Sequence, residues 1–212
     1  MANSRAALLR AKKVRLLLFD VDGVLTDGKL FIFPAPPGAQ QTIFEQASKH
    51  GSQGGFGLHS QTLLEAKGFH AHDGTAISLA RLAGIKTGLI TKRISETVAL
   101  RARDLKLEHV YQGIQDKRAV FEEILGQESL DPSEASFVGD DVIDLPVMRC
   151  CGLAIAVANA RVEVKREAHY VTPHAGGDGA LRDAVEYIVK AQGQWERVVE
   201  AYLGERSRKA AG

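Results

Sequence analysis

An apolar run, VRLLLF at residues 14–19, ends directly at Asp20 and constrains the fold more than any other feature of the sequence. Runs of this kind suit the central strands of a parallel sheet, which helices cover on both faces. Further runs occur at 85–90, 135–138 and 153–157, with shorter ones at 109–111 and 169–171. The sequence therefore predicts several buried parallel strands.

Segments with helical spacing of apolar residues lie between these runs. We expect helices at 76–83, from an N-cap at Ser95 to about Leu105, at 118–125, and at 183–203 with a candidate interruption at Gly193. Residues 1–13 are basic and mildly amphipathic, which predicts a short leading helix and not a signal peptide. The alternation of strands and helices indicates an α/β fold with a doubly wound parallel sheet.

The segment 29–71 interrupts this alternation. Residues 29–33 and 67–71 are predicted to form the two strands of a β-hairpin. Between them, residues 34–66 are too long for an ordinary hairpin loop and too rich in glycine and proline for a core segment. We interpret them as an insertion, partly helical around 42–48, within a single domain that spans residues 1–212.

Composition restricts the class of protein further. The chain has 27 Lys and Arg against 26 Asp and Glu, and the formal net charge of +1 excludes a strongly basic nucleic-acid binder. We therefore expect no nucleic-acid partner. No apolar run approaches the ~20 residues that a membrane helix needs, so we expect no membrane partner either. The two cysteines, Cys150 and Cys151, are adjacent and exclude a secreted disulfide framework. A cytoplasmic location is expected.

Polar residues follow the ends of the predicted strands. They comprise several carboxylates, one hydroxyl and one ammonium, on Asp20, Asp22, Thr91, Lys117, Asp140, Asp141 and Asp144. Because the carboxyl ends of parallel strands meet at one edge of a sheet, we expect these groups to gather there. Clustered carboxylates require a cation and suit Mg²⁺, and a lysine suits phosphate. The set favours phosphoryl transfer through an aspartyl phosphate.

The motifs DVDGVLTDG (20–28), Thr91, Lys117 and GDDVID (139–144) resemble, in order and spacing, the four motifs of the haloacid dehalogenase superfamily. Over residues 14–33 and 67–190 the chain resembles its capless sugar-phosphate phosphatases, typified by the 3-deoxy-D-manno-octulosonate 8-phosphate (KDO 8-phosphate) phosphatase family. The resemblance implies a Rossmann-like fold with no large cap domain. It also implies Mg²⁺-dependent hydrolysis of KDO 8-phosphate. A different substrate, such as a nonulosonate 9-phosphate, and a non-catalytic oligomerisation domain remain alternatives.

The same resemblance implies a role for each motif residue. Asp20 matches the nucleophile and Asp22 the general acid/base, and Thr91 and Lys117 match the residues that hold the phosphoryl group. The implied Mg²⁺ ligands are Asp20, the backbone carbonyl of Asp22, and Asp140. The enzyme implied is therefore a phosphoric monoester hydrolase with Mg²⁺ as its cofactor.

The chain departs from the family pattern at two positions near these motifs. Lys92 stands where the family usually has glycine, although the following Arg93 matches, and both are candidates for substrate binding. Asp178 stands where an arginine is usual, so a cation that could meet a sugar-acid carboxylate is missing or supplied elsewhere. Asp141 and Asp144 match residues that orient metal-bound waters and neighbouring loops.

The resemblance extends to assembly. Members of the family form homotetramers in which a β-hairpin from each subunit covers the neighbour's site, and residues 29–71 match that hairpin in enlarged form. The basic tail, with Arg206 and Arg208, is a further candidate for reaching a neighbouring site. His70 and His72 alternate on the predicted strand and share a face, but no third metal ligand accompanies them.

Overall fold

The computed structural model describes residues 5–35, 56–57 and 63–210, so the helix predicted around 42–48 lies outside the described residues. Six strands form one parallel sheet, in the order β10 (Tyr170–Val171), β9 (Leu153–Ala156), β8 (Ala135–Gly139), β1 (Leu16–Phe19), β5 (Lys86–Ile90) and β7 (His109–Tyr111). The chain runs outward from β1 through β5 and β7, and then outward on the other side through β8, β9 and β10. The predicted doubly wound parallel sheet is confirmed, with its switch point between β1 and β8.

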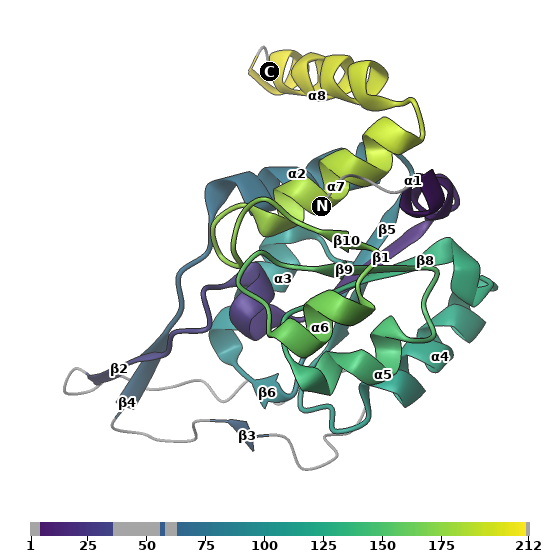
Figure 1. Ribbon diagram of the computed structural model, residues 1–212. Helices are drawn as coiled ribbons and strands as arrows, with labels where there is room; N and C mark the ends of the chain where they lie inside the picture. Colours follow the sequence, from purple (N-terminus) through teal and green to yellow (C-terminus); the bar gives the residue numbers. More distant parts are fainter. Residues whose placement is uncertain (1–4, 36–55, 58–62, 211–212) are drawn as a thin grey trace.

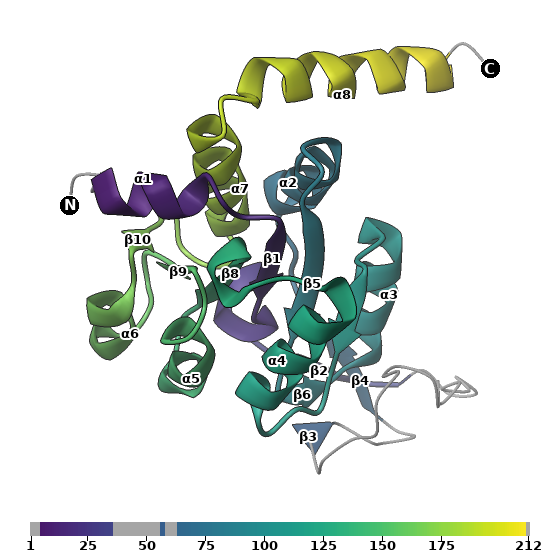
Figure 2. The ribbon, with the colours of Figure 1, turned by 90° about the vertical axis from the view of Figure 1, so that its right-hand side faces the viewer.

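Helices cover both faces of this sheet (Figures 1 and 2). One face carries α1 (Arg5–Ala11), α2 (Ala71–Leu82) and α7 (Ala180–Ala191), and the other carries α4 (Lys117–Glu128), α5 (Leu145–Met148) and α6 (Val162–Glu167). The four residues of β1 are fully buried between these layers, as the apolar run predicts. Among the helices that the structure describes, none is long and apolar enough to cross a lipid bilayer.

The predicted helix boundaries differ from the structure mainly at caps and glycines. The helix α3 (Glu96–Leu105) begins after Ser95, whose side chain accepts a hydrogen bond from the Val98 N–H, as predicted. The helix α2 begins five residues before its predicted start, because His70 caps it. The predicted helix 183–203 is two helices, α7 and α8 (Trp195–Ala210), because Gly193 adopts a left-handed φ of 67°.

The predicted hairpin exists, but its second strand is misplaced. The strand β2 (Phe31–Pro34) pairs antiparallel with β4 (Leu63–Ala66), and residues 67–70 lead into α2. The chain leaves the strand there because the Lys67 ammonium turns inward to a carboxylate and His70 caps the helix. The prediction that His70 and His72 share a strand face is therefore wrong. The hairpin projects from the body of the molecule (Figure 1).

Short elements link the hairpin and the loops at the carboxyl edge of the sheet. The two-residue strand β3 (Phe56–Gly57) pairs in parallel with β6 (Arg93–Ile94). A turn over Val21–Leu25 (η1), with non-helical backbone at Asp22 and Gly23, follows β1 and is closed by the Thr26 N–H, which donates to the Val21 carbonyl. Two 3₁₀ turns, η2 (Pro132–Glu134) and η3 (Val142–Asp144), flank β8. η1 and η3 thus follow the carboxyl ends of β1 and β8, whereas η2 precedes β8 at the opposite edge of the sheet.

Candidate active site

The ladder of the sheet fixes two of the predicted site residues. The Asp20 N–H donates to the Val138 carbonyl at 3.1 Å, which continues the β1–β8 pairing by one residue. The Thr91 N–H likewise donates to the Tyr111 carbonyl at 2.9 Å, beyond the end of β5. Both residues are buried. The carboxylate and the hydroxyl therefore have positions set by the backbone of neighbouring strands.

A buried lysine links two of the carboxylates. Lys117, at the start of α4, places its Nζ 2.9 Å from Asp20 Oδ2 and 2.7 Å from Asp144 Oδ1. Burial raises the pKa of Asp20 from 3.8 to about 6, against the opposing effect of Lys117. Burial alone would lower the pKa of Lys117, but Asp20 and Asp144 raise it above its usual value. Lys117 thus stays charged at neutral pH and offsets part of the acidic charge.

Asp144 holds the loop that follows β8. Its Oδ2 accepts hydrogen bonds from the Asp140 N–H at 3.0 Å and from the Asp141 N–H at 3.3 Å, while its Oδ1 pairs with Lys117. Asp141 in turn accepts from the Val142 N–H at 2.7 Å. Both Asp144 oxygens are therefore engaged, one with this loop and the other with Lys117.

Asp140 provides the clearest evidence for a cation site. Among the described residues its Oδ1 is buried without a hydrogen-bond partner, and ligand oxygens of Asp20, Asp140 and Asp144 lie within 4.8 Å of one another. Burial, followed by repulsion from Asp20 and Asp144, raises the pKa of Asp140 from 3.8 to about 7. A Cβ at Gly23 would lie 2.2 Å from Asp140 Oδ2, so only glycine leaves this space open. An all-oxygen, acidic donor set fits Mg²⁺, which Asp20 and Asp140 would hold.

Asp22 pairs with two cations. Its Oδ1 accepts from Lys67 Nζ, and its Oδ2 lies 3.4 Å from Arg93 Nε. Arg93 was a predicted substrate-binding residue, whereas Lys67 was not predicted to be in the site. No motif marks Lys67, which lies in the segment that the sequence suggested to be a hairpin strand. Its proximity to Asp22 depends on how the hairpin returns to the sheet, and only the fold shows this.

A cavity of about 270 Å³ opens over these groups. Its lining contains seven predicted site residues and one apolar side chain, namely Asp20, Asp22, Thr91, Lys92, Arg93, Asp140, Asp141 and Ile143. Lys117 is not among the lining residues, but it contacts Asp20, which is. Asp178 is not in the lining, and its Oδ1 lies 3.9 Å from His70 Nε2. The structure therefore brings the four predicted motifs together and leaves Asp178 outside them.

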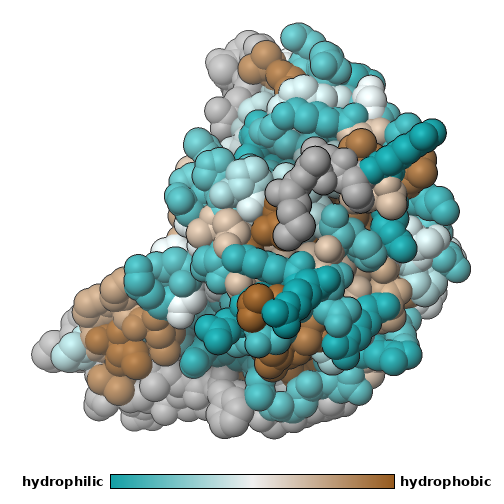
Figure 3. Space-filling view, in the orientation of Figure 1, coloured by the Kyte–Doolittle hydropathy of each residue, from teal (hydrophilic) through white to brown (hydrophobic). Residues whose placement is uncertain are grey.

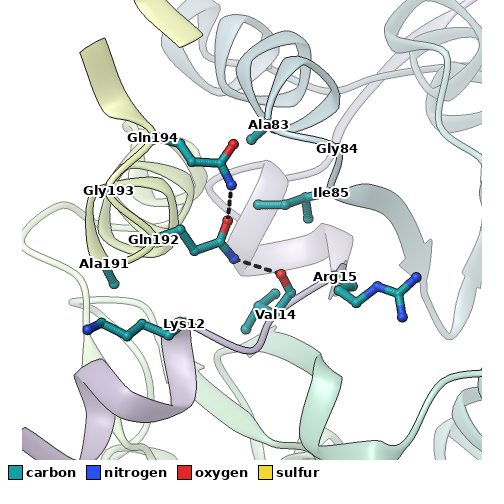
Figure 4. A pocket seen from close by; sticks show the side chains of 10 residues that line it. All are labelled: Lys12, Val14, Arg15, Ala83, Gly84, Ile85, Ala191, Gln192, Gly193 and Gln194. Atoms are coloured by element: carbon teal, nitrogen blue, oxygen red, sulfur yellow. Dashed lines mark hydrogen bonds between the residues drawn. The ribbon is translucent and has the colours of Figure 1, made fainter. Parts of the chain in front are cut away.

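A larger hollow of about 590 Å³ lies at the opposite edge of the sheet, next to the starts of β1 and β5 (Figure 4). Gln194 donates to Gln192 at 3.1 Å, and Gln192 donates to the Val14 carbonyl at 2.8 Å along its wall. Lys12 and Arg15 extend outward at its rim (Figure 4). The described lining of this hollow holds no carboxylate, in contrast to the smaller cavity, which gathers the predicted motif residues.

Comparison with known proteins agrees with this geometry. Residues 84–182 match the model of the haloacid dehalogenase-like hydrolase family. The chain is 35% identical over 187 residues to the 3-deoxy-D-manno-octulosonate 8-phosphate phosphatase KdsC of Yersinia pestis, covering 88% of this chain and 86% of that protein. A KdsC of Escherichia coli is 34% identical over 191 residues, which cover 90% and 87% of the two chains.

Solved structures agree as well. The crystal structure of the Yersinia pestis phosphatase has a TM-score of 0.75 at 33% identity, covering 91% of this chain and 89% of that one. The phosphatase of Moraxella catarrhalis, in complex with a magnesium ion, a phosphate ion and KDO, has a TM-score of 0.76 at 28% identity over 92% and 97%. The chain therefore belongs to the haloacid dehalogenase-like hydrolases and, within them, to the family of 3-deoxy-D-manno-octulosonate 8-phosphate phosphatases.

Proposed function

We propose that the chain is a Mg²⁺-dependent phosphatase that hydrolyses KDO 8-phosphate to KDO and inorganic phosphate. The observation that carries this proposal is the buried Asp20, paired with Lys117 at 2.9 Å beside the unpaired Asp140 oxygen. A carboxylate, an ammonium and a divalent cation at one point are the parts that phosphoryl transfer needs. The substrate is supported by the names of the relatives and by the ligands of the Moraxella catarrhalis structure.

In the first half of the reaction, an Asp20 oxygen attacks phosphorus and the bond from phosphorus to the sugar oxygen breaks. Asp22 gives its proton to that oxygen, so the sugar leaves as an alcohol and Asp20 carries an acyl phosphate. In the second half, Asp22 takes a proton from a water molecule that attacks phosphorus, and Asp20 is released with inorganic phosphate. A general acid/base of this kind contributes ~10²–10⁴-fold to a rate.

The remaining residues handle charge and orientation. Asp20, Asp140 and the backbone carbonyl of Asp22 would hold Mg²⁺, which would supply positive charge for the phosphoryl oxygens. Lys117 and the Thr91 hydroxyl complete the phosphoryl site in this proposal. Lys92 and Arg93, which line the cavity, meet the sugar acid. In this proposal the carboxylates therefore bind the metal, and the cationic side chains bind the substrate.

We further propose that the chain acts as one catalytic domain and assembles as a homotetramer. The supporting observation is the hairpin strand β2, where Phe31, Ile32 and Phe33 are 47%, 47% and 51% exposed. Figure 3 shows the corresponding apolar patch over β2 and β4, the hairpin strands located in Figure 1. Consecutive exposed apolar residues on one strand favour a protein partner over solvent. A neighbouring subunit is the partner that the family resemblance implies.

A substrate panel tests the proposed activity. Phosphate release would be measured with Mg²⁺ for KDO 8-phosphate, a nonulosonate 9-phosphate and neutral sugar phosphates, with Asp20→Asn as the inactive control. We expect the highest kcat/KM for KDO 8-phosphate and no turnover by Asp20→Asn. Preference for another sugar phosphate would overturn the substrate, and absence of Mg²⁺-dependent turnover on every compound would overturn the activity. Sedimentation velocity would test the tetramer separately.

A further inference from the structure

Lys67 is a buried cation whose role the family motifs leave open. Its side chain is only 1% exposed, and its ammonium pairs with Asp22 Oδ1. A buried lysine that keeps its charge needs a carboxylate partner, because desolvation disfavours the charged form. Lys67 follows β4 directly, so the hairpin delivers this charge to the carboxylate that the proposed reaction uses as its acid and base.

Lys67 and Arg93 both contact Asp22, but they differ in their exposure to solvent and to the cavity. Arg93 lines the cavity, and its side chain is 35% exposed. Lys67 is absent from the lining of the cavity and is covered by protein. Arg93 is therefore placed to leave Asp22 for an anionic substrate, while the partner of the Lys67 ammonium among the described residues is Asp22. We therefore expect Lys67 to affect the reaction through Asp22.

The pairing distinguishes the two oxygens of Asp22. An ammonium group has three donors and no acceptor, so the oxygen that pairs with it acts as an acceptor and is not the site of the proton. Lys67 holds Oδ1, and Oδ2 lies on the side of Arg93 and the cavity. A guanidinium is likewise donor-only, so Oδ2 can carry the proton only when Arg93 leaves it for the substrate, whereas Oδ1 stays paired with the buried Lys67.

A second contact from β4 supports this placement. Glu65 lies on β4, two residues before Lys67. The Ser95 hydroxyl donates to the Glu65 carboxylate, and the Thr97 hydroxyl donates to the Glu65 carbonyl at 3.3 Å. Ser95 also caps α3, which follows the Arg93 strand. Glu65 on β4 thus contacts Ser95 and Thr97, which follow Arg93 in the chain, and Lys67 just after β4 contacts Asp22.

We propose that Lys67 is a positioning residue for the proposed phosphatase reaction. It holds Asp22 Oδ1 so that Oδ2 gives the proton to the sugar oxygen and later takes one from water. The inference depends on the proposed function, and it adds a residue outside the four motifs. It also means that the base of the hairpin contributes to the site of its own subunit.

The test compares Lys67→Met with Lys86→Met as a control. Lys86 pairs with Glu128 at the opposite edge of the sheet, so the control also removes a lysine–carboxylate pair. For the sugar phosphate, we expect Lys67→Met to lower kcat by about 10- to 100-fold, with little change in KM. This is smaller than the ~10²–10⁴-fold that a general acid/base contributes, because the variant keeps Asp22 itself. p-Nitrophenyl phosphate has a leaving group that departs without a proton. Its first-turnover burst should therefore match the wild type in Lys67→Met. Lys86→Met should match the wild type on both substrates.

A double-mutant cycle separates positioning from general structural damage. If Lys67 acts through Asp22, Lys67→Met should cause no further loss in an Asp22→Asn background. Additive losses, or equal losses on the two substrates, would overturn the inference. Lys67→Gln, which keeps a hydrogen-bond donor without the charge, replaces Lys67→Met if thermal melting shows that variant to be unfolded. Wild-type turnover of the sugar phosphate tests the proposed function independently.

Discussion

Asp140 gives the most quantitative prediction, because its charge is unfavourable without a metal. Its Oδ1 is buried without a partner, and its pKa rises from 3.8 to about 7 through burial and the repulsion of Asp20 and Asp144. Asp140→Asn removes the charge and nearly preserves the shape. Without Mg²⁺, this variant should be more stable than the wild type above neutral pH.

The size of the effect follows from the raised pKa. At about 1.4 kcal/mol for each pH unit by which the folded-state pKa exceeds the unfolded one, the upper value is about 4 kcal/mol. Solvent reaches part of the Asp140 side chain and screens the repulsion, so we expect about 2 kcal/mol.

The sign follows from proton linkage. The folded protein binds the Asp140 proton more tightly than the unfolded chain. The stability from this group is therefore fully present below about pH 4 and is lost as the pH rises to about 7. Asp140→Asn carries no such dependence, so its advantage should grow over the same interval.

Urea denaturation in EDTA at about pH 5 and about pH 8 measures the difference in the free energy of unfolding between Asp140→Asn and the wild type. Asp178→Asn, which changes an exposed carboxylate outside the cavity, is the control. Saturating Mg²⁺ should then stabilise the wild type and leave Asp140→Asn almost unchanged. An Asp140→Asn variant no more stable than the wild type at about pH 8 would refute this account of the carboxylate cluster. So would equal stabilisation of the two proteins by Mg²⁺.

Three further predictions concern the same cluster. Lys117→Met should lower the free energy of unfolding by about 3–5 kcal/mol in urea titrations, because it leaves Asp20 and Asp144 buried without their cation; a loss below about 1 kcal/mol would contradict it. Gly23→Ala should abolish Mg²⁺ binding in calorimetry, because its Cβ would lie 2.2 Å from Asp140 Oδ2 at a φ of 95°; unchanged affinity would show that this space is not needed. Mg²⁺ affinity in calorimetry should rise with pH through about 6 to 7, where Asp20 and Asp140 lose their protons, and a flat profile would contradict those raised pKa values.

Much of the fold could be predicted because its signals are local. The apolar run at 14–19 marks a strand buried on both faces, and Ser95 marks a helix start by its capping chemistry. The order of the motif residues placed Asp20, Thr91 and Asp140 at one sheet edge, and the structure gathers them around one cavity. Because the carboxyl ends of parallel strands meet at one edge of the sheet, this convergence can be predicted without knowing the side-chain conformations.

The hairpin and its contacts could not be predicted in the same way. The strand β4 has no strict alternation of polar and apolar residues, and its register depends on pairing with β2 across a long intervening segment. The prediction therefore placed the strand at 67–71 and missed the turn of Lys67 toward Asp22. A pair between residues 45 positions apart is a tertiary contact, which no local pattern encodes.

The most direct test of the central claim is to trap the covalent intermediate. The enzyme would be quenched during turnover of KDO 8-phosphate with Mg²⁺ and reduced with borohydride, which converts an aspartyl phosphate to an alcohol. Mass spectrometry of the peptides would then locate the reduced residue. The account predicts reduction at Asp20, dependent on substrate and absent without it. Turnover with reduction at another residue, or with none at Asp20, would contradict the claim that Asp20 is the nucleophile.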